Sequence, residues 1–253
     1  MSGTVYLVGA GPGAADLLTV RAARLLGEAE VVFHDALIAG EVLRLASKAR
    51  KVAVGKRCGR HSTAQRFINK RLADAARSHQ VVVRLKGGDP MLFGRAHEEI
   101  AYLRARGVRV EVVPGVPAAL AASADLGISL TRRGAARSVA LVTPRVGEGE
   151  HESRWVASVI AADTVAIYMG AGEASAITAA LIAAGKPAHT PLALVEDASL
   201  PGMRVQLATL ADLPRLATRG GPTLILLGEV YREALTAAGL QRPGDRLRIS
   251  HTL

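Results

Sequence analysis

The chain has 253 residues, 49% of them hydrophobic and 21% charged, with a formal net charge of +10. This composition is typical of one large or two small globular domains and excludes an intrinsically disordered chain. The positive charge suits nucleic acid, an anionic membrane surface or a polyanionic small molecule. Aromatic residues make up only 3% and no long Lys/Arg block occurs, so nucleic acid is the minor alternative.

Cysteine and histidine usage indicates neither a disulfide nor a metal site. Cys58 is the one cysteine, which fits a reducing compartment. No apolar run approaches the roughly 20 residues of a membrane span, so we expect a cytoplasmic protein without a membrane segment. No metal is expected, because metal-ligand spacing is lacking among His61, His79, His97, His151 and His189.

In the first half of the chain, short apolar segments alternate with amphipathic, alanine-rich segments. This alternation predicts a mainly parallel, doubly wound sheet with helices on its faces. The expected helices begin near Thr19, Thr63 and Arg95. The expected strands are Thr4–Val8, Val31–His34, Lys51–Val54, Val81–Leu85 and Val108–Val113.

The run Pro114-Gly-Val-Pro117 interrupts this pattern, and a second series follows an alanine-rich helix. We therefore expect two α/β lobes, residues 1–115 and 116–240, and a polar tail at 241–253. The cleft between two such lobes is the default position for a ligand site. The strands expected in the second lobe are Ser138–Thr143, Thr164–Met169, Leu192–Glu196, Val205–Thr209 and Leu224–Leu227.

A glycine-rich loop, Gly9-Ala-Gly-Pro-Gly13, follows the first expected strand. With Asp35 at the end of the second strand, it suggests a nicotinamide-dependent dehydrogenase as one alternative. The spacing argues against this, because the fingerprint needs its third glycine three positions after the second, whereas Gly13 is two after Gly11. A dehydrogenase therefore remains a minor alternative.

The segment from Arg84 to Arg95 combines a strand end, a tight glycine turn, a carboxylate and cations. Ligands of open α/β sheets bind at the carboxyl ends of strands. Gly87 and Gly88 would let a ligand reach the main chain, and Asp89 offers acceptors. The segment is a candidate ligand site, and the alternative is an ordinary loop with a stiff turn.

Two further polar residues, Asp35 and Lys56, are expected at the ends of neighbouring strands. A carboxylate and an ammonium at such positions can serve as base and acid. The alternative is a surface ion pair.

These segments, in this order, resemble the uroporphyrinogen-III C-methyltransferases, which belong to the S-adenosylmethionine-dependent tetrapyrrole methylases. The resemblance covers nearly the whole chain and implies a two-lobed α/β fold. In that fold each lobe is a mixed, mainly parallel sheet flanked by helices, and the active site lies in the cleft between lobes. Its most specific parts are Val54-Gly-Lys-Arg57, Arg84 to Arg95, Val112-Val-Pro-Gly115 and Gly127-Ile-Ser-Leu-Thr131.

The resemblance implies roles for individual residues. Asp35 and Lys56 match the family's proposed proton acceptor and proton donor. Arg84, Lys86 and Arg95 are expected to bind substrate carboxylates. Pro117 stands where the family has a cofactor-contacting threonine, so a hydroxyl and an amide donor are lost there. The positions matching cofactor contacts are Pro12, Gly87, Gly88, Asp89, Leu92, Pro117, Ala118, Met169, Ala198 and Thr223.

The implied reaction methylates uroporphyrinogen III at C2 and C7, by way of precorrin-1, and gives precorrin-2 and S-adenosylhomocysteine. The many carboxylates of this polyanionic tetrapyrrole fit the net charge of +10. We expect a homodimer and neither a nucleic-acid nor a membrane partner. A methylase of a later precorrin is the closest alternative, and the sequence does not choose between cobalamin and sirohaem synthesis.

Overall fold

The computed structural model describes residues 3–54, 65–147 and 153–239. The chain forms two compact units, Met1–Ala118 (unit 1) and Ala119–Leu253 (unit 2), each with one five-stranded sheet. None of the described helices has the length and apolar character needed to cross a membrane.

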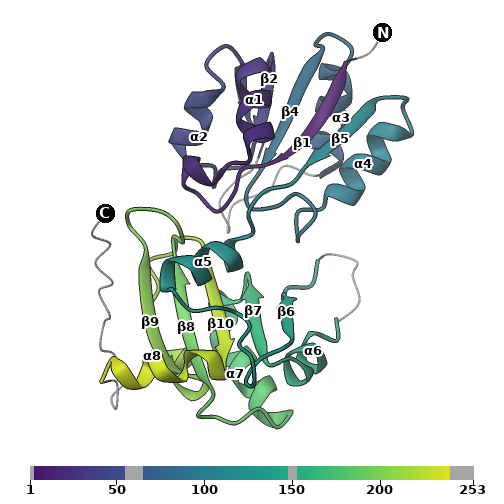
Figure 1. Ribbon diagram of the computed structural model, residues 1–253. Helices are drawn as coiled ribbons and strands as arrows, with labels where there is room; N and C mark the ends of the chain where they lie inside the picture. Colours follow the sequence, from purple (N-terminus) through teal and green to yellow (C-terminus); the bar gives the residue numbers. More distant parts are fainter. Residues whose placement is uncertain (1–2, 55–64, 148–152, 240–253) are drawn as a thin grey trace. The chain divides into compact units, whose positions relative to one another are not determined.

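Unit 1 alternates strands with helices (Figure 1), and its strand positions confirm the expected ones within a few residues. The buried strand β4 is rich in valine, which suits a sheet covered on both faces. Helix α1 begins after Thr19, whose side chain accepts from the backbone N–H of Ala22. The elements are β1 (Thr4–Gly9), α1 (Val20–Glu28), β2 (Val31–His34), α2 (Gly40–Leu45), β3 (Arg50–Ala53), α3 (Gln65–Ala75), β4 (Val81–Lys86), α4 (Ala96–Arg104) and β5 (Arg109–Val113).

The sheet of unit 1 has the order β3-β2-β4-β1-β5, and every pairing is parallel. The connection from β1 to β2 leads toward one edge, whereas that from β4 to β5 leads past β1 to the other edge. Helices α1 and α2 cover one face, and α3 and α4 cover the opposite face (Figure 1). Right-handed crossovers require this change of face. The carboxyl ends of β1 and β4 therefore form a topological switch point, where such sheets bind ligands.

Unit 2 packs helices on both faces of its sheet, with α5 and α8 on one face and α6 and α7 on the other. Helix α5 starts at the last residue of unit 1 and continues into unit 2. The elements are α5 (Ala118–Leu126), β6 (Val139–Val142), α6 (Trp155–Ala161), β7 (Thr164–Tyr168), α7 (Ala174–Ala183), β8 (Pro191–Glu196), β9 (Arg204–Thr209), β10 (Thr223–Gly228) and α8 (Arg232–Ala237).

The sheet of unit 2 has the order β6-β7-β10-β8-β9 and is mixed, as expected. Only the β6–β7 pair is parallel among its described pairings, so the sheet is mainly antiparallel rather than mainly parallel. For the β8–β9 pair, the physical reason is the length of the connecting segment. The connection between β8 and β9, residues 197–203, is too short for the crossover that a parallel pair requires.

Candidate functional site

Two glycine-containing loops meet at the switch point of unit 1. The loop after β1 and the loop after β4 are joined by a bridge between Gly11 and Gly88. The N–H of Gly88 donates to the carbonyl of Gly11 at 2.7 Å, and the reverse bond measures 3.2 Å. Both glycines have positive φ, 69° and 63°, which other residues adopt only with strain. Pro12 follows directly and is half-buried.

The loop after β5 packs against the same edge. A Cβ at Gly115 would clash with the carbonyl oxygen of Gly88, so close approach of these loops requires glycine. At Gly87 and Gly88, by contrast, an added Cβ would meet no described atom within 4 Å. The main chain there borders open space, as a cradle for a small molecule requires.

Asp89 uses its carboxylate to order these loops. One oxygen accepts from the N–H of Met91 at 2.7 Å, and the other accepts from the N–H of Gly115 at 3.0 Å. Leu92 is half-buried in the same loop, and Phe93 next to it has a positive φ of 52°. The predicted cofactor positions of unit 1 therefore lie on connected loops at one sheet edge.

Asp35 follows the carboxyl end of β2 and pairs with Arg84 of the adjacent strand β4. The Nη2 atom of Arg84 lies 2.6 Å from Oδ1 of Asp35, and its Nε lies 3.1 Å from Oε1 of Glu99. Burial lowers the pKa of Arg84, but the charges of Asp35 and Glu99 outweigh it, and the pKa lies above its ordinary value. The guanidinium thus remains charged in a buried position.

Lys86 is also buried, and its Nζ atom lies 3.2 Å and 3.3 Å from the two carboxylate oxygens of Glu99. Burial and the nearby charge of Arg84 lower the pKa of Lys86. Arg84 and Lys86 therefore have protein carboxylates as partners, and their predicted contact with substrate remains a prediction. Arg95 is different, because its side chain is 59% exposed and forms a two-bond pair with Glu98.

Glu98 and Glu99 were not predicted as site residues. Glu99 shares its buried helix face with Ala96 and Leu103. The sequence offered one signal for Glu99. It is a charged residue at an apolar position of a helix, and it follows two cations, Arg84 and Lys86, on the preceding strand. Lys56, the other predicted catalytic residue, lies outside the described residues.

In unit 2 the predicted cofactor positions lie at one end of the sheet. Met169 follows the end of β7, Ala198 follows the end of β8, and Thr223 begins the antiparallel strand β10 between them. The register places Thr223 opposite Glu196, just before Ala198. Met169 has a positive φ of 57°, and the residue is 45% exposed. The topology of the sheet thus brings together three residues that are far apart in sequence.

Pro117 and Ala118 lie at the beginning of α5. Ala118 is the first residue of the helix, and Pro117 precedes it. The next residue, Ala119, donates its N–H to the Tyr168 hydroxyl at 3.1 Å. Burial raises the pKa of Tyr168. This bond holds the first turn of α5 against Tyr168, which directly precedes Met169.

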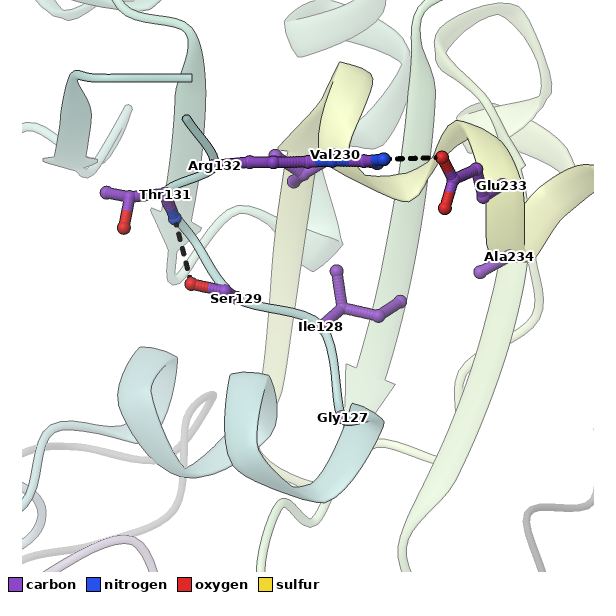
Figure 2. Close-up of a pocket in the computed structure, with 8 residues that line it drawn as sticks. All are labelled: Gly127, Ile128, Ser129, Thr131, Arg132, Val230, Glu233 and Ala234. Carbon is purple, nitrogen blue, oxygen red and sulfur yellow. Dashed lines mark hydrogen bonds and ion pairs between the residues drawn. The ribbon is translucent and has the colours of Figure 1, made fainter. Parts of the chain in front are cut away.

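A pocket of about 270 Å³ lies elsewhere in unit 2, between residues 127–132 and the region around α8 (Figure 2). The Arg132–Glu233 ion pair, at 2.7 Å, joins the two sides. The Oγ of Ser129 accepts from the N–H of Thr131 on the loop side. None of the predicted site residues lines this pocket, so it does not coincide with the loops described above.

A family model described as "Tetrapyrrole (Corrin/Porphyrin) Methylases" matches residues 4–214. The chain belongs to the tetrapyrrole methylases. Methylases of this family use S-adenosylmethionine as methyl donor.

Curated relatives of this tetrapyrrole methylase include several siroheme synthases. Those of Pseudomonas fluorescens (strain Pf0-1) and Psychrobacter sp. (strain PRwf-1) are 46% and 45% identical over 91% of this chain. The matches cover 51% and 48% of those proteins. The chain therefore spans about half the length of these curated relatives.

Solved structures show the same fold. A uroporphyrin-III C-methyl transferase from Thermus thermophilus, complexed with S-adenyl homocysteine, is 43% identical, with a TM-score of 0.81. The match covers 91% of this methylase and 100% of that chain. A cobalt precorrin-4 methyltransferase is 26% identical, with a TM-score of 0.79 and coverage of 90% and 95%.

Proposed function

We propose that this methylase is a uroporphyrinogen-III C-methyltransferase, which methylates C2 and then C7 to give precorrin-2. The observation that carries the proposal is the 43% identity to a uroporphyrin-III C-methyl transferase over that whole chain. The glycine loops at the switch point support it, because they leave main chain open to a small molecule.

The proposed cofactor contacts come from both units. In unit 1 they are made by the loops that carry Pro12, Gly87, Gly88, Asp89 and Leu92. Further contacts come from Pro117 and Ala118 at the start of α5, and from Met169, Ala198 and Thr223 at one end of the unit 2 sheet. Pro117 offers only its ring and carbonyl, so neighbouring backbone must supply any donor.

Bound S-adenosylmethionine supplies an electrophilic methyl group, which bonds to a pyrrole carbon as its bond to sulfur breaks. The protein's task is to place that carbon in line with the methyl group and to exclude water. The methylated ring must also lose a proton, and we assign this transfer to Asp35 and Lys56. Asp35 suits the role because its side chain is 31% exposed, whereas its partner Arg84 and the Glu99 carboxylate that also binds Arg84 are buried.

Substrate binding is proposed to use cations against the carboxylates of the tetrapyrrole. Arg95 is the first candidate, because its side chain is 59% exposed, although its guanidinium also donates two bonds to Glu98. Arg84 is buried and paired with Asp35 and Glu99, and Lys86 is buried and paired with Glu99. A substrate carboxylate that bound either cation would therefore have to share that cation with a protein carboxylate.

A methyltransferase of a later precorrin is the second candidate. The resemblance to the cobalt precorrin-4 methyltransferase, at 26% identity, favours it more weakly than the 43% match favours the first. The pathway served, sirohaem or cobalamin, stays open. We further propose a cytoplasmic homodimer. Sedimentation at micromolar concentration tests the dimer, and a fully active monomer would refute it.

The deciding experiment incubates the purified protein with S-adenosylmethionine and uroporphyrinogen III under reducing conditions. We expect two methyl groups per tetrapyrrole, counted by mass spectrometry, together with S-adenosylhomocysteine and the absorption spectrum of oxidised precorrin-2. Precorrin-2 offered as the starting substrate is the matched control. Methylation of precorrin-2, with none of uroporphyrinogen III, would reject the proposal in favour of the second candidate.

A further inference from the structure

Glu99 is a fully buried carboxylate in a helix stripe that is otherwise apolar. Its exposed fraction is 0%, and the other buried residues of α4 are Ala96 and Leu103. A buried carboxylate destabilises a fold unless its charge is balanced and its oxygens accept hydrogen bonds. The buried position of Glu99 therefore depends on the cations and hydrogen-bond donors around its carboxylate.

Three side chains from two elements donate to Glu99. Oε1 accepts from Arg84 Nε at 3.1 Å, Lys86 Nζ at 3.2 Å and Gln65 Nε2 at 3.0 Å. Oε2 accepts from Lys86 at 3.3 Å. Gln65 lies on α3, and its side chain also donates to Asn69 at 2.9 Å. Glu99 thus ties strand β4 to helices α3 and α4.

Arg84 connects Glu99 to Asp35, because its guanidinium binds both carboxylates. Its Nε donates to Glu99, its Nη1 donates to the Leu85 carbonyl at 3.2 Å, and its Nη2 donates to Asp35 at 2.6 Å. Because the guanidinium is planar and rigid, bonds in three directions fix its orientation. The position of Asp35 is therefore set by a group that Glu99 holds.

The charges of the four residues balance as two carboxylates and two cations. Only Asp35 has substantial exposure, 31%, whereas the side chains of Arg84, Lys86 and Glu99 are at most 5% exposed. Without the charge of Glu99, both cations would compete for Asp35, the one carboxylate left in the cluster. A carboxylate held by two cations is a weaker proton acceptor.

We propose that Glu99 is a positioning residue for the methylation reaction, acting through Arg84 to hold Asp35 in place and leave it available for proton transfer. This rests on the proposed function, in which Asp35 transfers the proton. Glu99 is not assigned any contact with substrate or cofactor.

The test is Glu99→Gln, which keeps the shape and removes the charge. We expect kcat to fall about tenfold or more, with KM for uroporphyrinogen III and Kd for S-adenosylmethionine changed less than about threefold. The control is Glu30→Gln. Glu30 also orders unit 1, by accepting from the N–H groups of Gln80 and Val81, but it lies at the amino end of the sheet. Its kcat should stay within about twofold of wild type.

A double-mutant cycle separates action through Asp35 from general damage. In an Asp35→Asn background, Glu99→Gln should lower kcat less than about twofold further, because its target is already lost. If the double variant instead shows the product of the two separate losses in kcat, the proposal is refuted. If Glu99→Gln does not fold, Arg84→Lys keeps the positive charge but removes the planar guanidinium that joins Glu99 to Asp35. Near-normal kcat in that variant would also refute the proposal.

An independent readout is the Arg84 Nε–H signal in nitrogen-15 NMR spectra, assigned by its loss in Arg84→Lys. We expect exchange of this proton with water to speed up about tenfold or more in Glu99→Gln. Unchanged exchange would overturn the inference. This readout needs no turnover, so it remains decisive if the wild-type protein does not methylate uroporphyrinogen III and the proposed function fails.

Discussion

The carboxylate of Asp89 accepts a hydrogen bond from the backbone N–H of Gly115 at 3.0 Å, which fastens the loop after β4 to the loop after β5. The bridge between Gly11 and Gly88 fastens the loop after β1 to the same edge. Three loops from different parts of unit 1 therefore present one connected backbone surface, and substitutions at their contacts should act on all three.

Gly88→Val should abolish binding of S-adenosylmethionine. Gly88 has a φ of 63°, and no described atom lies within 4 Å of its Cβ position, so valine would strain the backbone and fill the space proposed for the cofactor. The control is Gly107→Val, which imposes the same strain at φ of 69° but lies before β5, at the opposite end of the sheet. Calorimetry measures both, and unchanged affinity in a folded Gly88→Val protein would refute this assignment.

Gly115→Ala should destabilise the protein and weaken cofactor binding together. The added Cβ would overlap the Gly88 carbonyl, and overpacking of this kind costs about 1–3 kcal/mol. Gly87→Ala is the matched control for stability, because no described atom lies within 4 Å of its Cβ position. Urea denaturation gives both free energies of unfolding. Equal stability of the two variants would contradict the close packing.

Asp35→Asn and Lys56→Met should each reduce turnover far more than affinity for S-adenosylmethionine. A positioned acid or base contributes about 10²–10⁴-fold, so the residue whose proton transfer is slow should show a loss in that range. Lys56→Arg should restore much of the rate only if Lys56 acts as an electrostatic anchor.

Asp74→Asn is the control for these variants, because Asp74 is an exposed carboxylate paired with Lys70 and Arg77. Turnover and cofactor affinity should both stay near wild type in that protein. Near-normal turnover in both Asp35→Asn and Lys56→Met would show that other residues carry the chemistry.

Pro117→Thr should change affinity for S-adenosylmethionine by no more than about 1.5 kcal/mol, the scale of one neutral hydrogen bond. Residue 117 precedes the first residue of α5, where threonine is a favourable N-cap. We therefore expect the variant to fold with unreduced helix stability, as measured by thermal denaturation. Complete loss of turnover would show instead that the proline shapes the site.

Asp163→Asn should destabilise the protein at neutral pH but not in acid. The Asp163 carboxylate accepts from the N–H groups of Arg137 and Ser138 and from the Ser138 hydroxyl. These bonds, first that from Arg137, lower the pKa of Asp163 below its ordinary value. The stabilisation is therefore present above the unfolded-state pKa and is lost as pH falls through the lower folded-state pKa. Melting temperatures of both proteins at pH 7 and pH 3 test this, and a constant difference would contradict it.

The sequence by itself determined the strands of unit 1 and the loops that follow them. Valine-rich runs and glycine turns are local signals, and they indicated β4 and the turn at Gly87 and Gly88 correctly. The order of motifs also predicted the family that the family model identifies. The expectation of a mainly parallel second sheet did not hold in unit 2, because pairing direction depends on connection length and strand order, and β10 inserts antiparallel between β7 and β8.

Only the tertiary structure decided what the cations of β4 contact. The sequence predicted that Arg84 and Lys86 bind substrate carboxylates, but it did not predict that both are buried against Glu99, which lies 15 residues after Arg84 on another element. The pairing of Arg84 with Asp35 spans 49 residues and exists because β2 and β4 are neighbours in the sheet. Local sequence carries propensity and periodicity, whereas burial and charge pairing arise when the sheet order brings distant segments together.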